Sequence, residues 1–61
     1  MNQERKYKRS YATHFIKLDK SIRFYQVLNG RLYVWIADRW MYECWFKDFP
    51  ESFKSLMQEA P

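Results

Sequence analysis

Residues 22–37 read IRFYQVLNGRLYVWIA, which is two apolar runs separated by Asn29-Gly30. Asn-Gly suits both central positions of a type I′ turn, where the backbone needs positive φ and its twist matches that of paired strands. This dipeptide between two apolar runs is the strongest short-range sequence signal for a β-hairpin. We therefore expect an antiparallel hairpin formed by strands 22–28 and 31–37.

Two neighbouring segments extend this hairpin. Residues 40–46 are rich in aromatic side chains and predict a third main strand after a break at Asp38-Arg39. Residues 11–18 alternate imperfectly, so they fit either an additional first strand or an irregular arm packed on the domain. We expect a three-stranded antiparallel meander, which becomes four-stranded if residues 11–18 pair with it.

After Lys47 the pattern becomes that of a helix. Pro50 fits a first helical turn, where its missing N–H costs nothing, and Asp48 and Glu51 stand at capping-box spacing. Apolar residues then recur at spacings of three and four as a single stripe: Phe49, Phe53, Leu56, Met57 and Ala60. Because a helix of roughly ten residues is marginal alone in water, it must lie on the sheet. The predicted fold is a single α+β domain over residues 10–61, with one C-terminal helix packed on one face.

A two-residue turn at Asn29-Gly30 decides which side chains share a face of the sheet. This turn places on one face the residues that are better suited to pack against the helix: Tyr25, Val27, Leu32, Val34 and Ile36. The opposite face then carries at least one further tryptophan beside Phe24, Tyr33 and Trp35. Unless residues 11–18 fold back over it, this aromatic surface indicates a partner or dimer interface.

The third strand has two alternatives, which depend on the loop at Asp38-Arg39. A two-residue loop places on the face away from the helix Trp40, Tyr42, Cys44 and Phe46. One extra residue places these four under the helix and exposes Met41, Glu43 and Trp45. Asp-Arg is a poor type I′ pair and Glu43 prefers water, so the longer loop is favoured.

Composition excludes several functional classes. The 61-residue chain supports one small domain with a thin core, and its single cysteine, Cys44, indicates a reducing, cytoplasmic setting. No apolar run is long enough for a signal peptide or a membrane span. His14 and Cys44 are too few for a zinc site, no spacing brings them together as a catalytic pair, and Gly30 is the single glycine. We therefore expect no enzyme activity, no metal, no cofactor and no small-molecule substrate.

The net charge of +4 is concentrated at the N-terminus. Residues 1–9 hold Glu4 and four basic residues, a balance of +3: Arg5, Lys6, Lys8 and Arg9. Residues 10–61 hold seven basic and six acidic groups, a balance of +1. We expect residues 1–9 to form a disordered basic arm, which is either a solubilising terminus or a segment that docks onto phosphates.

Aromatic and basic side chains along the strands have a structural and a functional interpretation. Tyr33 and Trp35 either form cross-strand pairs that hold the sheet together, or stack on bases or anchor a protein partner. Four basic residues are either a solvated rim or contacts to phosphates and base edges: Arg23, Arg31, Arg39 and Lys47.

The order of these segments resembles a known DNA-binding plan. YQVLNGRLYVWIA (25–37), a third strand ending in WF, and KDFPESFKSLM (47–57) follow one another as in AP2-type and integrase arm-binding domains and in cell-division activator-like proteins. The likeness covers residues 21–60 and rests on Asn29, Gly30, Arg31, Tyr33, Val34, Trp35, Phe49, Glu51 and Phe53.

The resemblance implies that the sheet face opposite the helix enters the major groove of duplex DNA. The resemblance further implies that the bases are contacted by Gln26, Arg31, Tyr33 and Trp35. It implies that the DNA backbone is contacted by Arg23 and Arg39. Such domains usually carry several basic residues on this face, whereas the present chain carries aromatic ones. We expect a small non-enzymatic DNA-binding regulatory protein that uses the open face and the basic arm. The alternative is a protein-binding module, namely an inhibitor, an adaptor or a homodimer, that uses the same aromatic face.

Overall fold

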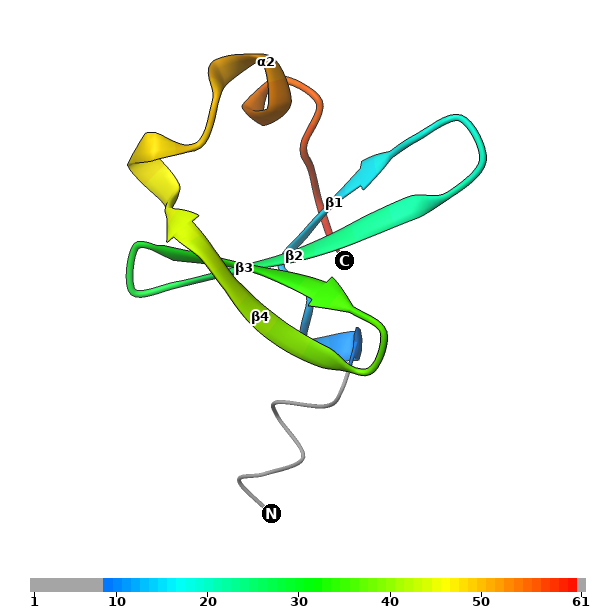
Figure 1. The fold of residues 1–61 in the computed structure, drawn as a ribbon. Helices are drawn as coiled ribbons and strands as arrows, with labels where there is room; N and C mark the ends of the chain where they lie inside the picture. Colours follow the sequence, from blue (N-terminus) through cyan, green and yellow to red (C-terminus); the bar gives the residue numbers. More distant parts are fainter. Residues whose placement is uncertain (1–8, 61) are drawn as a thin grey trace.

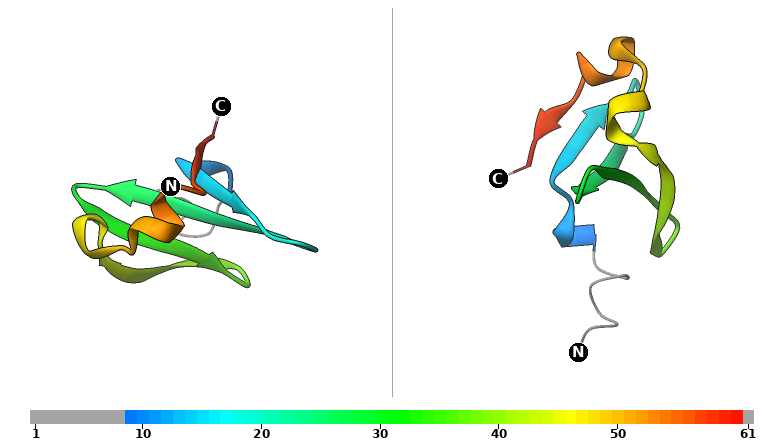
Figure 2. Two further views of the ribbon diagram at one scale, coloured as in Figure 1. Left: turned by 90° about the horizontal axis from the view of Figure 1, so that it is seen from above. Right: turned by 90° about the vertical axis from the view of Figure 1, so that its left-hand side faces the viewer.

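A computed structural model describes residues 9–60, and within them five antiparallel strands form one open sheet (Figures 1 and 2). The strands are β1 (His14–Lys17), β2 (Ile22–Leu28), β3 (Arg31–Ile36), β4 (Arg39–Trp45) and β5 (Gln58–Glu59), and they lie in the order β4-β3-β2-β1-β5. Two 3-10 turns, η1 (Arg9–Tyr11) and η2 (Phe46–Asp48), and a short helix, α2 (Glu51–Lys54), complete the described fold. The predicted α+β class is confirmed, and residues 11–18 do supply a further strand.

The predicted hairpin turn joins β2 to β3. Asn29 and Gly30 have φ angles of 53° and 77°, and Leu28 pairs with Arg31, as a type I′ turn requires. The N–H of Phe46 donates to the carbonyl oxygen of Gly30 at 2.8 Å. This hydrogen bond attaches the start of η2 to the turn, so the hairpin also positions the chain that follows β4.

Replacing Gly30 tests this turn. We expect Gly30→Ala to lower the free energy of unfolding by about 1–2 kcal/mol, the cost of a left-handed backbone conformation once a Cβ is present. The added Cβ would lie 3.8 Å from the Trp45 ring, which is ordinary contact, so the cost comes from the backbone and not from a clash. Urea denaturation followed by circular dichroism measures it.

Ala37 provides the matched control for this substitution, because it has a φ of 60° and carries a Cβ already. Ala37→Gly should leave the free energy of unfolding unchanged or raise it slightly, since relief of the positive φ offsets the added freedom of the unfolded chain. Equal destabilisation by both substitutions would contradict the assigned backbone conformations.

The connection between β3 and β4 differs from the prediction. Ile36 pairs with Arg39, so the turn is the two-residue Ala37-Asp38, and the expected longer loop at Asp38-Arg39 is wrong. Two-residue hairpin turns with positive φ match the twist of the strands that they join, and Ala37 adopts that φ although it is not glycine. Trp40 consequently pairs with Trp35, on the sheet face away from α2.

A β-bulge then changes the facing of the residues along β4. Tyr42 pairs with Tyr33, but Cys44 pairs with Leu32, so Glu43 is the extra residue on β4. Cys44 therefore shares a face with Leu32, while Trp45 pairs with Arg31. The alternative with a two-residue loop is right for Trp40 and Tyr42, and the alternative with a longer loop is right for Cys44 and Trp45. Neither holds for the whole strand, because both assumed that facing alternates without interruption.

The hydrophobic core lies on the face of the sheet covered by residues 46–60, which we call the inner face (Figure 1). Its buried members are Ile16, Tyr25, Leu32, Val34 and Phe49, and partly buried residues packed against them are Val27, Cys44, Phe46 and Met57. The ring centroids of Tyr25 and Phe49 are 5.5 Å apart. The predicted helix-side face is thus confirmed, except that Ile36, beside the Ala37-Asp38 turn, is exposed.

The C-terminal helix is shorter than the apolar stripe predicts. α2 ends at Lys54, and residues 58–59 pair with β1 as β5 (Figure 2, right), with the N–H of Ala60 donating to the carbonyl oxygen of Thr13 at 2.9 Å. Hydrogen bonds to the sheet edge therefore replace those of a longer helix. Of the predicted stripe, Phe49 and Met57 pack in the core, whereas Phe53 and Leu56 are exposed.

The start of α2 also differs from the prediction. Pro50 stands at the N-cap, Phe49 before it is extended, and within residues 9–60 no side chain caps the helix. Asp48 and Glu51, although at capping-box spacing, therefore form no capping box, and the cap that the sequence left open is Pro50. Across the described range, no helix has the length and apolar character needed to cross a membrane.

Candidate functional site

The sheet face opposite residues 46–60, which we call the outer face, is the largest aromatic surface that the register defines. Its aromatic members come from four strands: Phe15, Phe24, Tyr33, Trp35, Trp40, Tyr42 and Trp45. All seven side chains are half-buried or exposed. The prediction that Phe24, Tyr33, Trp35 and a further tryptophan share this face is confirmed.

Four of these rings form two cross-strand pairs between β3 and β4. Tyr33 and Tyr42 have ring centroids 5.9 Å apart at an interplanar angle of 68°. Trp35 and Trp40 lie 5.2 Å apart at 66°. Edge-to-face pairs of this kind contribute roughly 0.5–1.5 kcal/mol each beyond the burial of their area. The structural interpretation of Tyr33 and Trp35 is confirmed, yet Tyr42 keeps 54% of its surface exposed.

Arg31 lies at the end of the outer face next to the Asn29-Gly30 turn. Its guanidinium carbon is 5.3 Å from the centroid of the Trp45 ring, the residue with which it pairs across the strands. This is cation–π distance, and it holds the exposed guanidinium over the ring. A positive charge is thereby fixed at this end of the aromatic surface.

At the N-terminal side, η1 contacts the outer face. The guanidinium carbon of Arg9 is 5.1 Å from the centroid of the Phe24 ring, and the side-chain amide of Gln26 donates to the carbonyl oxygen of Tyr11 at 3.4 Å. Gln26, predicted to read bases, is therefore already bonded to the main chain. Arg9 is the residue of the predicted arm that the structure describes; Arg5, Lys6 and Lys8 lie outside the described residues.

The two arginines predicted to contact the DNA backbone occupy register positions of the inner face. Arg23 pairs with Ile16 and Arg39 pairs with Ile36, and both arginines are exposed near strand ends. The Nε of Arg39 forms an ion pair with a carboxylate oxygen of Asp38 at 3.3 Å. The fold thus brings together Gln26, Arg31, Tyr33 and Trp35, but does not bring these two arginines to them.

The charges of the outer face have one sign in the described part of the chain. Lys17 and Arg31 occupy its register positions, and Arg9 lies over one of its rings. Between residues 9 and 60, no carboxylate is paired at such a position: the acidic residues lie in turns, in residues 46–54 or on the inner-face position of β5, and Glu43, in the bulge, has no partner in the register. The outer face therefore combines aromatic rings with positive charge.

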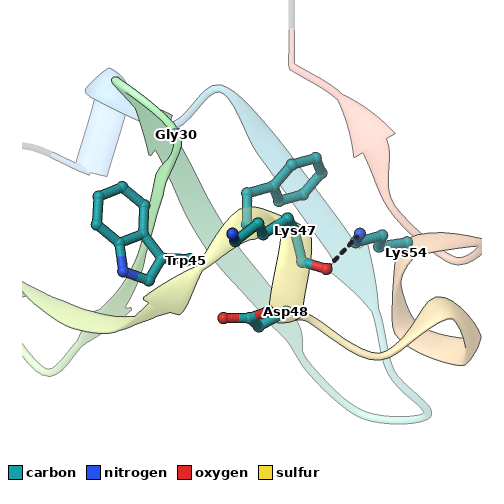
Figure 3. Close-up of a pocket in the computed structure, with 6 residues that line it drawn as sticks. Gly30, Trp45, Lys47, Asp48 and Lys54 are labelled. Carbon is teal, nitrogen blue, oxygen red and sulfur yellow. Dashed lines mark hydrogen bonds between the residues drawn. The ribbon is translucent and has the colours of Figure 1, made fainter.

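An open pocket lies beside the Asn29-Gly30 turn, lined by Gly30, Trp45, Phe46, Lys47, Asp48 and Lys54 (Figure 3). The ammonium of Lys54 is 4.9 Å from the centroid of the Phe46 ring and donates to the carbonyl oxygen of Lys47 at 3.4 Å. It also lies 3.4 Å from a carboxylate oxygen of Glu51. These contacts connect α2 to η2, and they engage the Lys54 ammonium within the protein.

Chemically reactive groups are scarce in the described residues. The pKa of the Cys44 thiol is raised, first by burial and then by the negative charges of Glu43 and Asp48, so the thiol stays protonated at neutral pH. His14 Nδ1 and Thr13 Oγ1 share a hydrogen bond of 2.8 Å. Residues 9–60 contain no cluster of histidine, cysteine and acidic side chains able to hold a metal ion.

Sequence reasoning missed part of this surface. Its candidate residues included Tyr33 and Trp35 but not Trp40, Tyr42 or Trp45, whose facing depends on the Ala37-Asp38 turn and the bulge. Choosing a two-residue turn between the second and third strands would have identified Trp40 and Tyr42, because their facing then follows from strand alternation. No local sequence signal identifies the bulge that turns Trp45 outward.

Comparison of the chain with protein-family models, with curated proteins and with solved structures gives no match. The likeness to AP2-type and integrase arm-binding domains therefore stays a prediction.

Proposed function

We propose that this chain is a small non-enzymatic DNA-binding regulatory protein, which contacts DNA with its outer face and its basic N-terminal arm. The observation that supports this best is the composition of the outer face, where aromatic rings lie among the positive charges of Arg9, Lys17 and Arg31 and, in the described residues, no carboxylate is paired at a register position of this face. Rings can stack on bases and cations attract phosphates. The same face offers an acidic partner no repulsion.

Salt dependence of binding tests the proposal. Fluorescence anisotropy with labelled DNA should show an affinity that falls linearly with salt on a double-logarithmic plot. Replacing Arg5, Lys6, Lys8 and Arg9 together by glutamine should reduce the slope by about 0.7–0.9 for each phosphate that the variant no longer neutralises. Lys20→Gln, in the turn between β1 and β2, is the control and should leave the slope unchanged. Absent or salt-independent binding would reject the proposal.

A protein-binding module is the second candidate, and a specific observation favours it. The outer face exposes the large apolar side chains of Ile22, Leu28 and Trp45. It also carries tryptophan, tyrosine and arginine, the residue types that dominate binding energy between proteins. Sedimentation at the concentrations of the anisotropy experiment separates the candidates: a stable dimer that binds no DNA supports this second one.

A further inference from the structure

We infer that the outer face binds single-stranded rather than duplex nucleic acid, by stacking unpaired bases on its rings. This inference rests on the proposed function and narrows its ligand.

The polar side chains of this face are poorly placed to read a duplex. In a duplex the bases stack on one another, so a protein reaches only their edges, through hydrogen bonds in the grooves. On β2 and β3 the outer-face side chains suited to this are Gln26 and Arg31. The amide of Gln26 already donates to the carbonyl oxygen of Tyr11, and the guanidinium of Arg31 lies over Trp45. Two side chains with base-reading chemistry on these strands are few beside the seven aromatic rings of the same face.

The aromatic side chains, by contrast, occupy adjacent register positions across four strands, with the Arg9 guanidinium over the Phe24 ring. Phe15 pairs with Phe24 and Trp35 pairs with Trp40, and these two pairs adjoin in the register, since Tyr25 pairs with Val34. With strands ~4.8 Å apart, this row extends over roughly 14 Å. The next rows contain Tyr33 with Tyr42, and then Trp45. Every base has a π-face, so such a surface binds unpaired bases with little regard to sequence.

Packing between the rings prepares them for stacking. The edge-to-face contacts of Tyr33 with Tyr42 and of Trp35 with Trp40 restrict the side-chain rotamers before any ligand binds. Binding then removes less conformational freedom from these side chains. Tyr42, on the edge strand β4, is the most exposed of these four rings and the best placed to receive a base.

Positive charges stand at both ends of the aromatic surface. Arg9 lies over Phe24 at one end, and Arg31 lies over Trp45 at the other. A single strand whose bases lie on the rings between them would place its phosphates within reach of these guanidinium groups. The paired register positions of this face carry positive charges and, among residues 9–60, no carboxylate, which favours a polyanion over a protein surface with few acidic groups.

Titration with three probes tests the inference: oligothymidylate and oligouridylate of about 12 nucleotides, within the ~4–16-nucleotide site sizes of single-strand-binding domains, and a DNA duplex of the same length. Intrinsic tryptophan fluorescence should be quenched by at least one of the single strands, with an affinity about 10-fold or more above that for the duplex. Oligothymidylate should bind at least as tightly as oligouridylate, and a clear preference for the RNA strand would overturn DNA as the ligand in the proposed function while supporting the stacking of unpaired bases.

Three substitutions of Tyr42 separate stacking from general apolar contact. Tyr42→Phe keeps the ring and should bind the single strand like the original protein. Tyr42→Leu and Tyr42→Ala should both bind about 5- to 100-fold more weakly, although leucine retains apolar area. Leu56→Ala, an exposed residue of the C-terminal segment, is the control and should leave the affinity unchanged. Thermal melts of each variant verify that it folds.

The outcomes distinguish this inference from the proposed function. Duplex binding equal to or tighter than single-strand binding would overturn the inference while leaving the proposed function intact. Failure to bind any of the probes would overturn both, and capture of a protein partner instead would favour the second candidate. Undiminished binding by Tyr42→Leu would overturn the stacking mode. The comparison of probes uses the unaltered protein, so it holds whether or not a variant folds.

Discussion

Leu32→Ala is expected to lower the free energy of unfolding by about 2–5 kcal/mol, a large part of the total for a chain of this size. Leu32 is 0% exposed and lies on β3 between Val27 and Cys44 of the two adjacent strands. Truncation of a buried leucine to alanine costs about 2–5 kcal/mol, since the loss of apolar burial is joined by the cavity left behind. A chain of this size has roughly 3–9 kcal/mol of stability in total. Urea denaturation followed by circular dichroism measures the change.

Leu28→Ala is the matched control, because Leu28 belongs to the outer face of β2 and is 48% exposed. Its truncation should cost about 1 kcal/mol or less, as most surface substitutions do. Similar losses from the two leucines would contradict the assignment of the core to the inner face.

Phe49→Ala is expected to cost about 3–5 kcal/mol, the usual loss for a buried phenylalanine. Phe49 is 6% exposed, and its ring lies 5.5 Å from that of Tyr25 and 5.6 Å from that of Phe53. It joins the C-terminal segment to the sheet, so its loss should also free Met57 and β5. Urea denaturation measures the stability, and hydrogen exchange of the Ala60 amide, which is bonded to Thr13, measures the release of β5.

Phe53→Ala tests whether that loss is specific to the buried ring. Phe53 stacks on Phe49 but is 46% exposed, so its removal should cost less than half as much and leave the Ala60 amide protected. Stability of Phe49→Ala within ~1 kcal/mol of the original would show that the C-terminal segment contributes little to the core.

Local sequence signals accounted for the centre of the fold. Asn29-Gly30 specifies positive φ at two successive positions, and the pairing of β2 with β3 follows from it without further information. Because pairing across a two-residue turn also determines facing, the burial of Tyr25, Leu32 and Val34 was predictable. So was the outward facing of Tyr33 and Trp35.

Features that depend on distant parts of the chain were not predictable in this way. The helix ends early because residues 58–59 pair with β1, which lies more than 40 residues away in the sequence. The apolar periodicity of residues 49–60 does not depend on β1 and so could not predict this pairing. The bulge at Glu43 likewise has no glycine to mark it. In the candidate site, Gln26 was correctly placed on the outer face, but its bond to the Tyr11 carbonyl depends on how η1 returns to the sheet.

The bulge at Glu43 has a consequence for polymerisation as well as for facing. β4 forms one margin of the described sheet, where unpaired main-chain groups can recruit strands from other molecules. An inserted, charged residue interrupts that row, and the opposite margin, β5, is two residues long. Neither edge strand of the described sheet therefore offers a long, flat template for fibril growth. These two edges disfavour edge-to-edge aggregation in a protein that exposes many aromatic side chains.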